Sequence, residues 1–146
     1  MNPQDFASAQ RRAGQSAAAV AAALKQTYGV SAQEAAKLLK GAGYTANDTA
    51  VALKQTFQLT AQDMAYILKT EYQLSAQAVA QVMRGAQYTA DQVASAMQTV
   101  FNFTADQVNT VLTAVGYAAN EVADAMKSVF NWIKKNPFAP LDPRRW

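Results

Sequence analysis

Cysteine and histidine are both absent from the 146 residues of this chain. Without thiols the chain forms no disulfide and offers neither a cysteine nucleophile nor a thiolate metal ligand. Without imidazole it lacks the commonest general base and the commonest ligand of transition metals. We therefore expect no enzyme activity, no bound metal and no cofactor.

Long apolar runs are also missing. The longest, "AAAVAAAL" from Ala17 to Leu24, has eight residues, whereas a membrane-spanning helix needs about 20. We thus expect no transmembrane segment, and the opening "MNPQDFASAQRR" lacks the basic-then-apolar order of a signal peptide. The net charge of +3 is too mild to indicate a nucleic-acid partner by itself.

The chain is 51% hydrophobic and 16% charged, a balance typical of a folded domain. Much of the apolar content is alanine, which favours helix and close backbone approach but contributes little burial per residue. We therefore expect a thin, continuous core.

The sequence repeats itself at intervals of 14 or 15 residues. The eight units open on Ser16, Ser31, Thr45, Thr60, Ser75, Thr89, Thr104 and Ala118. A hydroxyl oxygen at a helix start accepts a hydrogen bond from an otherwise unpaired backbone N–H. An acid or glutamine stands three positions later in six of the eight units, as in a capping box. Each opening residue is therefore predicted to be a helix N-cap.

An apolar stripe follows each predicted cap. The fourth position after the cap holds Val20, Ala35, Thr49, Met64, Val79, Val93, Val108 and Val122. The eighth holds Leu24, Leu39, Leu53, Leu68, Met83, Met97, Leu112 and Met126. The fifth is alanine in seven units, with Asn109 as the exception. Positions 4, 5, 8 and 11 share one face at helical period, so we predict that they are the buried side.

Two kinds of unit ending alternate. The longer kind carries an aromatic twelve positions after the cap, at Tyr28, Phe57, Tyr72, Phe101 and Phe130. The shorter kind places a tyrosine directly before the next cap, at Tyr44, Tyr88 and Tyr117. Glycine in these shorter endings suits a left-handed C-cap. We interpret the aromatics as side chains that hold one helix against the next turn, with a ligand groove as the alternative.

The repeat predicts the fold class. No helix of about three turns is stable alone in water, so each must bury its stripe against its neighbours. We predict an all-α fold, a solenoid or superhelical array of helical hairpins. Its parts are an N-terminal cap segment (1–15), an eight-unit repeat domain (16–132) and a C-terminal tail (133–146). Two consecutive longer endings, in the units that open at Thr45 and Thr60, would bend the superhelix.

The stretches "AGYTANDTAVALKQTF", "FNFTADQVNTVL" and "EVADAMKSVFNW" resemble the short α-helical tandem repeats of large bacterial secreted or surface proteins. The resemblance covers nearly the whole chain and implies a scaffold, with a secreted or cell-surface location. The openings "LTAQDMAYIL" and "FTADQVNTVL" are also similar to the first helix of the TAL-effector-type DNA-binding repeat. That family's glycine-rich base-reading loop has no counterpart here, which argues against base recognition.

A basic residue recurs nine positions after the cap. The series consists of Lys25, Lys40, Lys54, Lys69, Arg84 and Lys127. In a superhelix such a series forms a spiral stripe that would follow a phosphate backbone without reading bases. The simpler interpretation is that cations near a helix C-terminus meet its negative end. We favour the simpler one.

The C-terminal stretch "FNWIKKNPFAPLDPRRW" departs from the repeat, because its prolines forbid continued helix. As a linker or cap it would cover the last helix. As a recognition peptide it would present Trp132, Pro137, Phe138, Leu141, Arg144, Arg145 and Trp146 to a partner, since Arg and Trp are enriched at binding hot spots.

We accordingly predict a non-enzymatic structural or protein-interaction module, a helical-repeat scaffold or spacer whose partner is a protein or peptide. Its binding face would carry side chains that vary between units, and Gln33, Asn47, Gln62, Gln77 and Gln92 are candidate surface positions. One alternative is a repeat handle that presents the tail to a partner or a modifying enzyme. The other is weak, non-specific nucleic-acid binding through the basic stripe.

Overall fold

The computed structural model describes residues 1–130. The predicted recognition tail, from Trp132 to Trp146, and the last residues of the predicted repeat domain lie outside the described residues. Within residues 1–130 every regular element is helical, which confirms the all-α fold class for this part of the chain. The α-helices are α1 (Pro3–Arg12), α2 (Ala17–Ala23), α3 (Ala32–Ala42), α4 (Ala46–Phe57), α5 (Ala61–Glu71), α6 (Ala76–Gly85), α7 (Ala90–Phe101), α8 (Ala105–Ala114) and α9 (Ala119–Phe130). Helix α2 continues into a π-helical turn, η1 (Leu24–Tyr28).

The predicted N-caps are confirmed at all seven hydroxyl residues. Each side-chain oxygen accepts a hydrogen bond from the backbone N–H three residues later, over 3.1 to 3.3 Å. The reciprocal bond of a capping box is present where the third residue is glutamine, at Gln92 and Gln107, each accepting over 2.8 Å. At the unit without a hydroxyl, the Glu121 carboxylate still accepts from the Ala118 N–H over 2.9 Å.

Helix α1 has the same local design as the helices that follow it. The side chain of Asn2 accepts from the Asp5 N–H over 2.8 Å, and Pro3 occupies the first turn, where its missing N–H costs nothing. Ala7, five positions after Asn2, is fully buried. Residues 2–14 therefore have the form of one more repeat unit.

The buried face of the helices follows the predicted stripe with one exception. All residues at the fourth and eighth positions are at most 5% exposed, and so are the seven alanines at the fifth. The eleventh position was predicted wrongly, since among its residues only Ala86 is buried and Thr27 is exposed. It falls on the last helical turn, near the helix end. The seventh position is buried in its place, at Ala52, Ile67, Val82, Ala96, Val111 and Ala125.

Among the described residues, the turn that follows each helical segment from α1 to α8 contains one residue in the left-handed region. These residues are Gly14, Gly29, Gly43, Gln58, Gln73, Gln87, Asn102 and Gly116, with φ between 53° and 103°. The shorter endings form Schellman motifs, as at Gly43, where the N–H groups of Gly43 and Tyr44 bond the carbonyls of Lys40 and Leu39. At a longer ending, Gln58 instead donates to the carbonyl of Lys54 over 2.9 Å. Left-handed C-caps thus occur at both kinds of ending, not only at the glycines of the shorter one.

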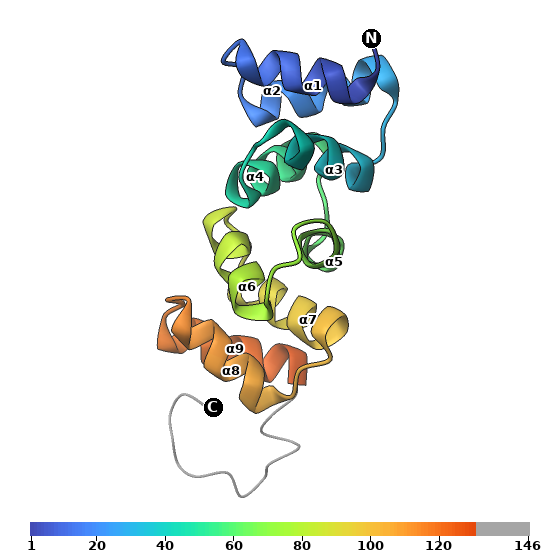
Figure 1. Ribbon diagram of the computed structural model, residues 1–146. Coiled ribbons are helices and arrows are strands. Elements are labelled where there is room, and N and C mark those ends of the chain that lie inside the picture. The colour runs from blue at the N-terminus through green and yellow to red at the C-terminus, as the bar shows by residue number, and fades with distance from the viewer. Residues whose placement is uncertain (131–146) are drawn as a thin grey trace, which may run out of the picture. The chain divides into compact units, whose positions relative to one another are not determined.

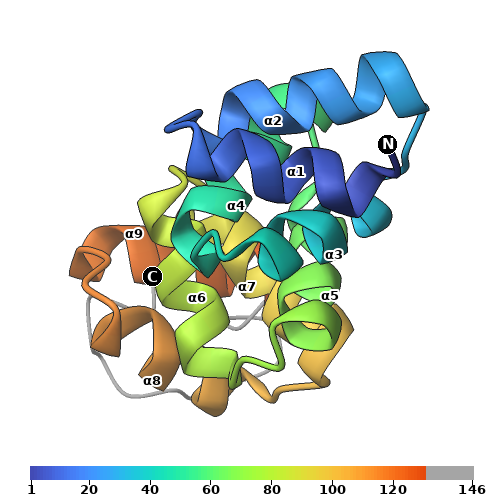
Figure 2. The same ribbon diagram turned by 45° about the horizontal axis from the view of Figure 1, so that its top comes forward.

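The chain divides into two compact units, Met1–Leu74 and Ser75–Trp146. In the first, α1 packs on α3, α2 on α4 and α3 on α5, and consecutive helices also touch. Figures 1 and 2 show α1 and α2 side by side, with α3 and α4 as the next pair. In the second, α6 packs on α8 and α7 on α9, and α8 lies beside α9 (Figure 1). Within each of these two compact units, helices therefore pack both against the next helix and against the next but one. The boundary at Leu74 directly follows the two consecutive longer endings.

Candidate interaction surface

The predicted basic and aromatic series meet each other in the structure. The Lys25 Nζ donates to the carbonyl of Thr56 over 3.1 Å and lies 5.3 Å from the centre of the Phe57 ring. Lys40 repeats this arrangement at the end of α5, with 2.6 Å to the carbonyl of Glu71 and 5.7 Å to the Tyr72 ring. In both cases a helix receives a cation at its negative C-terminal end from the helix two places before it.

The arginines make related contacts. The guanidinium of Arg11 lies 5.7 Å from the centre of the Tyr44 ring, and that of Arg84 lies 5.6 Å from the Tyr117 ring. Lys54 and Lys69, which belong to the same basic series, also have interaction partners. Lys25 and Lys40 are therefore held within the chain at the C-terminus of a helix other than their own, and Arg11 and Arg84 are held over tyrosine rings.

The tyrosine hydroxyls also connect repeat units that lie two places apart in the chain. Tyr44 Oη donates to the carbonyl of Gln15 over 2.5 Å, and Tyr117 Oη donates to the carbonyl of Tyr88 over 2.6 Å. Tyr72 Oη donates to the carbonyl of Tyr44 over 3.0 Å and lies 2.6 Å from Oγ1 of the buried Thr49. These three tyrosines therefore connect parts of the chain two repeat units apart, rather than one helix and the next turn as we predicted, and Tyr44 also lines the depression described below.

Burial raises the pKa of these phenols. Desolvation is the largest cause at Tyr44, Tyr72 and Tyr117, and it raises the pKa of Tyr117 to about 12. The guanidinium of Arg84 lowers the pKa of Tyr117 in part, and the Glu121 carboxylate raises it slightly further. All three phenols remain neutral hydrogen-bond donors at physiological pH.

The compact unit Met1–Leu74 carries a surface depression of about 300 Å³ between α2 and α4. Its lining consists of Ser16, Ala17, Ala18, Tyr44, Asp48, Val51 and Ala52. The hollow follows from the sequence of α2, which places alanine at Ala18, whereas α3, α5 and α6 have glutamine at this second position. The lining is mainly apolar, and its one charged side chain is an acid, Asp48.

Val51 belongs to a series that the sequence analysis did not identify. The sixth position after each cap holds Ser8, Ala22, Lys37, Val51 and Tyr66 in the first unit and Gln81, Ser95, Thr110 and Asp124 in the second. None of these side chains is buried, and Val51 and Tyr66 are exposed large apolar residues, at 39% and 54%. The sixth position varies from charged to aromatic, whereas the fourth, fifth and eighth hold mainly apolar residues, and this contrast was visible in the sequence.

Two of the surface positions that the sequence favoured, Gln33 and Gln92, take part in local bonding. Gln33 Nε2 donates to Thr70 Oγ1 over 3.1 Å, which connects α3 to α5. Gln92 closes the capping box of α7. Gln33 and Gln92 thus contribute to local structure, whereas Asn47 and Gln77 are exposed.

Within residues 1–130 no group of three or more Asp, Glu, His or Cys side chains is placed to hold a metal ion. In the same part of the chain, no helix has the length and apolar character needed to cross a membrane. Comparisons with family models, curated proteins and solved structures find no match for this chain.

Proposed function

We propose that this protein is a peptide- or protein-binding scaffold whose helices stack as a solenoid. The support for the stacking is the packing of each helix on the next and the next but one, repeated in both units. Further support for the stacking comes from cation–ring contacts that each join parts of the chain two helices apart. They are made by Lys25, Lys40, Arg11 and Arg84. Such arrays present repeated surface positions on a constant core.

The observation that carries the binding role is the depression between α2 and α4. It joins an apolar hollow to an exposed member of the variable sixth position, Val51. Because Asp48 is the only charged residue in the lining, the site favours a peptide with an apolar side chain next to a lysine or arginine.

The basic series supports this function over nucleic-acid binding. A cation that already meets a carbonyl and an aromatic ring, as at Lys25 and Lys40, would have to leave both to contact a phosphate. We accordingly expect little retention on heparin at low salt; strong, salt-dependent retention would instead favour the nucleic-acid alternative.

The test is selection of binding peptides from a random displayed library on the full chain. Ala18→Gln fills the hollow with the residue that Gln33 and Gln62 provide at the same position of other helices, so the fold should survive. Lys37→Gln, on the sixth position of α3, is the control. We expect peptides rich in apolar–basic pairs whose affinity falls at least about tenfold, or 1.4 kcal/mol, with Ala18→Gln and not with Lys37→Gln.

Two outcomes would refute the site. One is a set of peptides that bind Ala18→Gln as well as the unchanged chain. The other is the absence of any enrichment above a helical protein of similar size. Circular dichroism on each variant shows whether the helices are intact.

A further inference from the structure

In several places a cation near the end of one helix lies over an aromatic ring two helices further on. Lys127 has the same position in its helix but no such ring among the described residues. Four cations, Arg11, Lys25, Lys40 and Arg84, each lie over an aromatic ring 32 or 33 residues later in the sequence. Lys127 occupies the same ninth position on α9. Among residues 1–130 no ring lies over it, because the described part contains no helix two places beyond α9.

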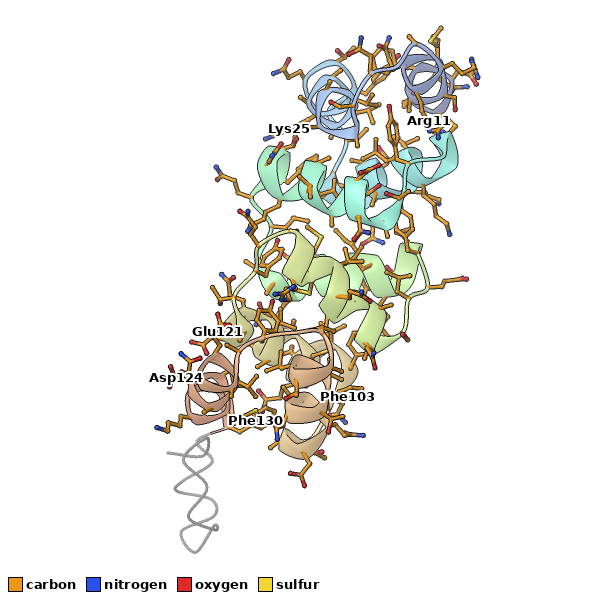
Figure 3. All side chains as sticks on the ribbon, turned by 90° about the vertical axis from the view of Figure 1, so that its left-hand side faces the viewer. Arg11, Lys25, Phe103, Glu121, Asp124 and Phe130 are labelled. Atoms are coloured by element: carbon orange, nitrogen blue, oxygen red, sulfur yellow. The ribbon has the colours of Figure 1, made fainter. Side chains whose placement is uncertain are left out.

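The exposed side of α9 is acidic next to this lysine. Glu121, Asp124 and Lys127 follow one another at intervals of three, so they are neighbours on the helix surface. Glu121 and Asp124 are both exposed, and Figure 3 shows them on the same outward side of α9. Between residues 75 and 130 the chain has four acids and two bases, a net charge of −2.

The residues that follow α9 have the opposite charge and the missing ring. Segment 131–146 holds four basic residues and one acid, a net charge of +3, together with both tryptophans of the chain. Its sixteen residues extend up to about 50 Å, and the twelve residues of α9 span about 18 Å. The segment is therefore long enough in sequence for the stretch from Arg144 to Trp146 to return along the whole helix.

We propose that segment 131–146 docks on the outer side of α9, with the Trp146 ring over Lys127 and with Arg144 and Arg145 beside Asp124 and Glu121. The segment is attached directly to α9, so its effective concentration is in the millimolar range and a weak contact is enough. Docked in this way, the segment supplies the ring that a helix two places further on supplies elsewhere in the chain. This site is separate from the depression between α2 and α4, and the two proposals do not depend on each other.

Tryptophan fluorescence reports on this segment alone, since the chain has no other tryptophan. In a Trp132→Phe variant, excited at 295 nm so that the tyrosines do not contribute, all tryptophan emission comes from Trp146. We expect acrylamide to quench this emission with a constant about half that of a free indole or lower, because the ring is covered on one face. The constant should not depend on protein concentration, and it should rise with salt as the charge contacts weaken.

Matched variants test the partners. Lys127→Ala should raise the quenching constant toward the free value, and so should Glu121→Gln combined with Asp124→Asn. Glutamine at 121 keeps the acceptor for the Ala118 N–H, as Gln92 does for Thr89, so the helix start should persist. The control is Glu34→Gln with Asp63→Asn in the first unit, which removes the same charge and should leave the constant unchanged.

Three results would overturn the proposal. The first is a Trp146 quenched as freely as indole, which would favour a presented tail. The second is protection that none of the α9 variants reduces. The third is protection that grows with protein concentration, since it would place the segment on a second copy of the chain.

Discussion

Tyr117 gives a prediction in which the size of a substitution's effect on stability depends on pH. Its side chain is 9% exposed, its Oη donates to the carbonyl of Tyr88 over 2.6 Å, and its pKa is raised to about 12. Tyr117→Phe removes the donor and leaves that carbonyl without its phenol partner. At pH 8 we expect a loss of about 1–2 kcal/mol in the free energy of unfolding.

The loss should shrink as the pH rises. The phenol titrates near 10.0 in the unfolded chain and near 12 in the folded one. Its contribution to stability is therefore complete below pH 10 and declines as the pH rises through the folded pKa. With these two values the unchanged protein loses about 1.4 kcal/mol between pH 8 and pH 11 through this group. Phenylalanine does not titrate, so most of the difference between the two proteins should disappear by pH 11.

The assay is urea unfolding followed by circular dichroism at pH 8 and pH 11, on the unchanged chain and on Tyr117→Phe. Only the difference between the proteins matters, because other tyrosines and the lysines titrate equally in both. Tyr66→Phe, at a side chain that is 54% exposed, is the control and should change stability by less than about 0.5 kcal/mol at either pH. A difference for Tyr117→Phe that stays constant from pH 8 to pH 11 would show that the buried phenol does not titrate as described.

Three further substitutions test the turns, the cation contacts and the core. Gln73→Gly should stabilise by about 0.5–1 kcal/mol, because glycine removes the strain of φ 54° at a modest entropic cost; an unchanged urea midpoint would contradict this. Lys40→Met keeps the aliphatic stem but loses the carbonyl and ring contacts, and it should cost about 0.5–1.5 kcal/mol more than the exposed Lys37→Met in thermal unfolding. Leu112→Ala, at a fully buried position, should cost about 2–5 kcal/mol, and a loss below 1 kcal/mol in the same assay would place that side chain outside the core.

Sequence alone predicts what a single helix specifies. A hydroxyl cap needs only the residue and the backbone three positions later, so Ser16 to Thr104 were predictable one by one. The buried stripe follows from the helical period, and it failed at the eleventh position because the period does not say where the last turn becomes exposed. The left-handed Gln58, Gln73 and Gln87 were missed because glutamine, unlike glycine, has no preference for that region.

Contacts between helices lie beyond such reasoning. The basic and aromatic series were both visible, but nothing local says that Lys25 meets Phe57 or that Arg84 meets Tyr117. A constant separation of 32 or 33 residues between the two series was the available clue. The hollow at Ala18 is likewise a property of two helices, since it needs the neighbouring α4 to become a depression.

The most direct test of the proposed stacking compares two internal deletions. Removing Ser16–Tyr44, which is two units, joins the left-handed Gly14 and Gln15 to the cap Thr45 and keeps each helix on its own side of the stack. Removing Ser16–Val30, which is one unit, moves every later helix to the opposite side. We predict that the two-unit deletion leaves a soluble protein with unchanged ellipticity per residue and cooperative unfolding, while the one-unit deletion loses most of its stability. Equal tolerance of both deletions, or the loss of helical structure in both, would contradict a stack in which each helix depends on the next and the next but one.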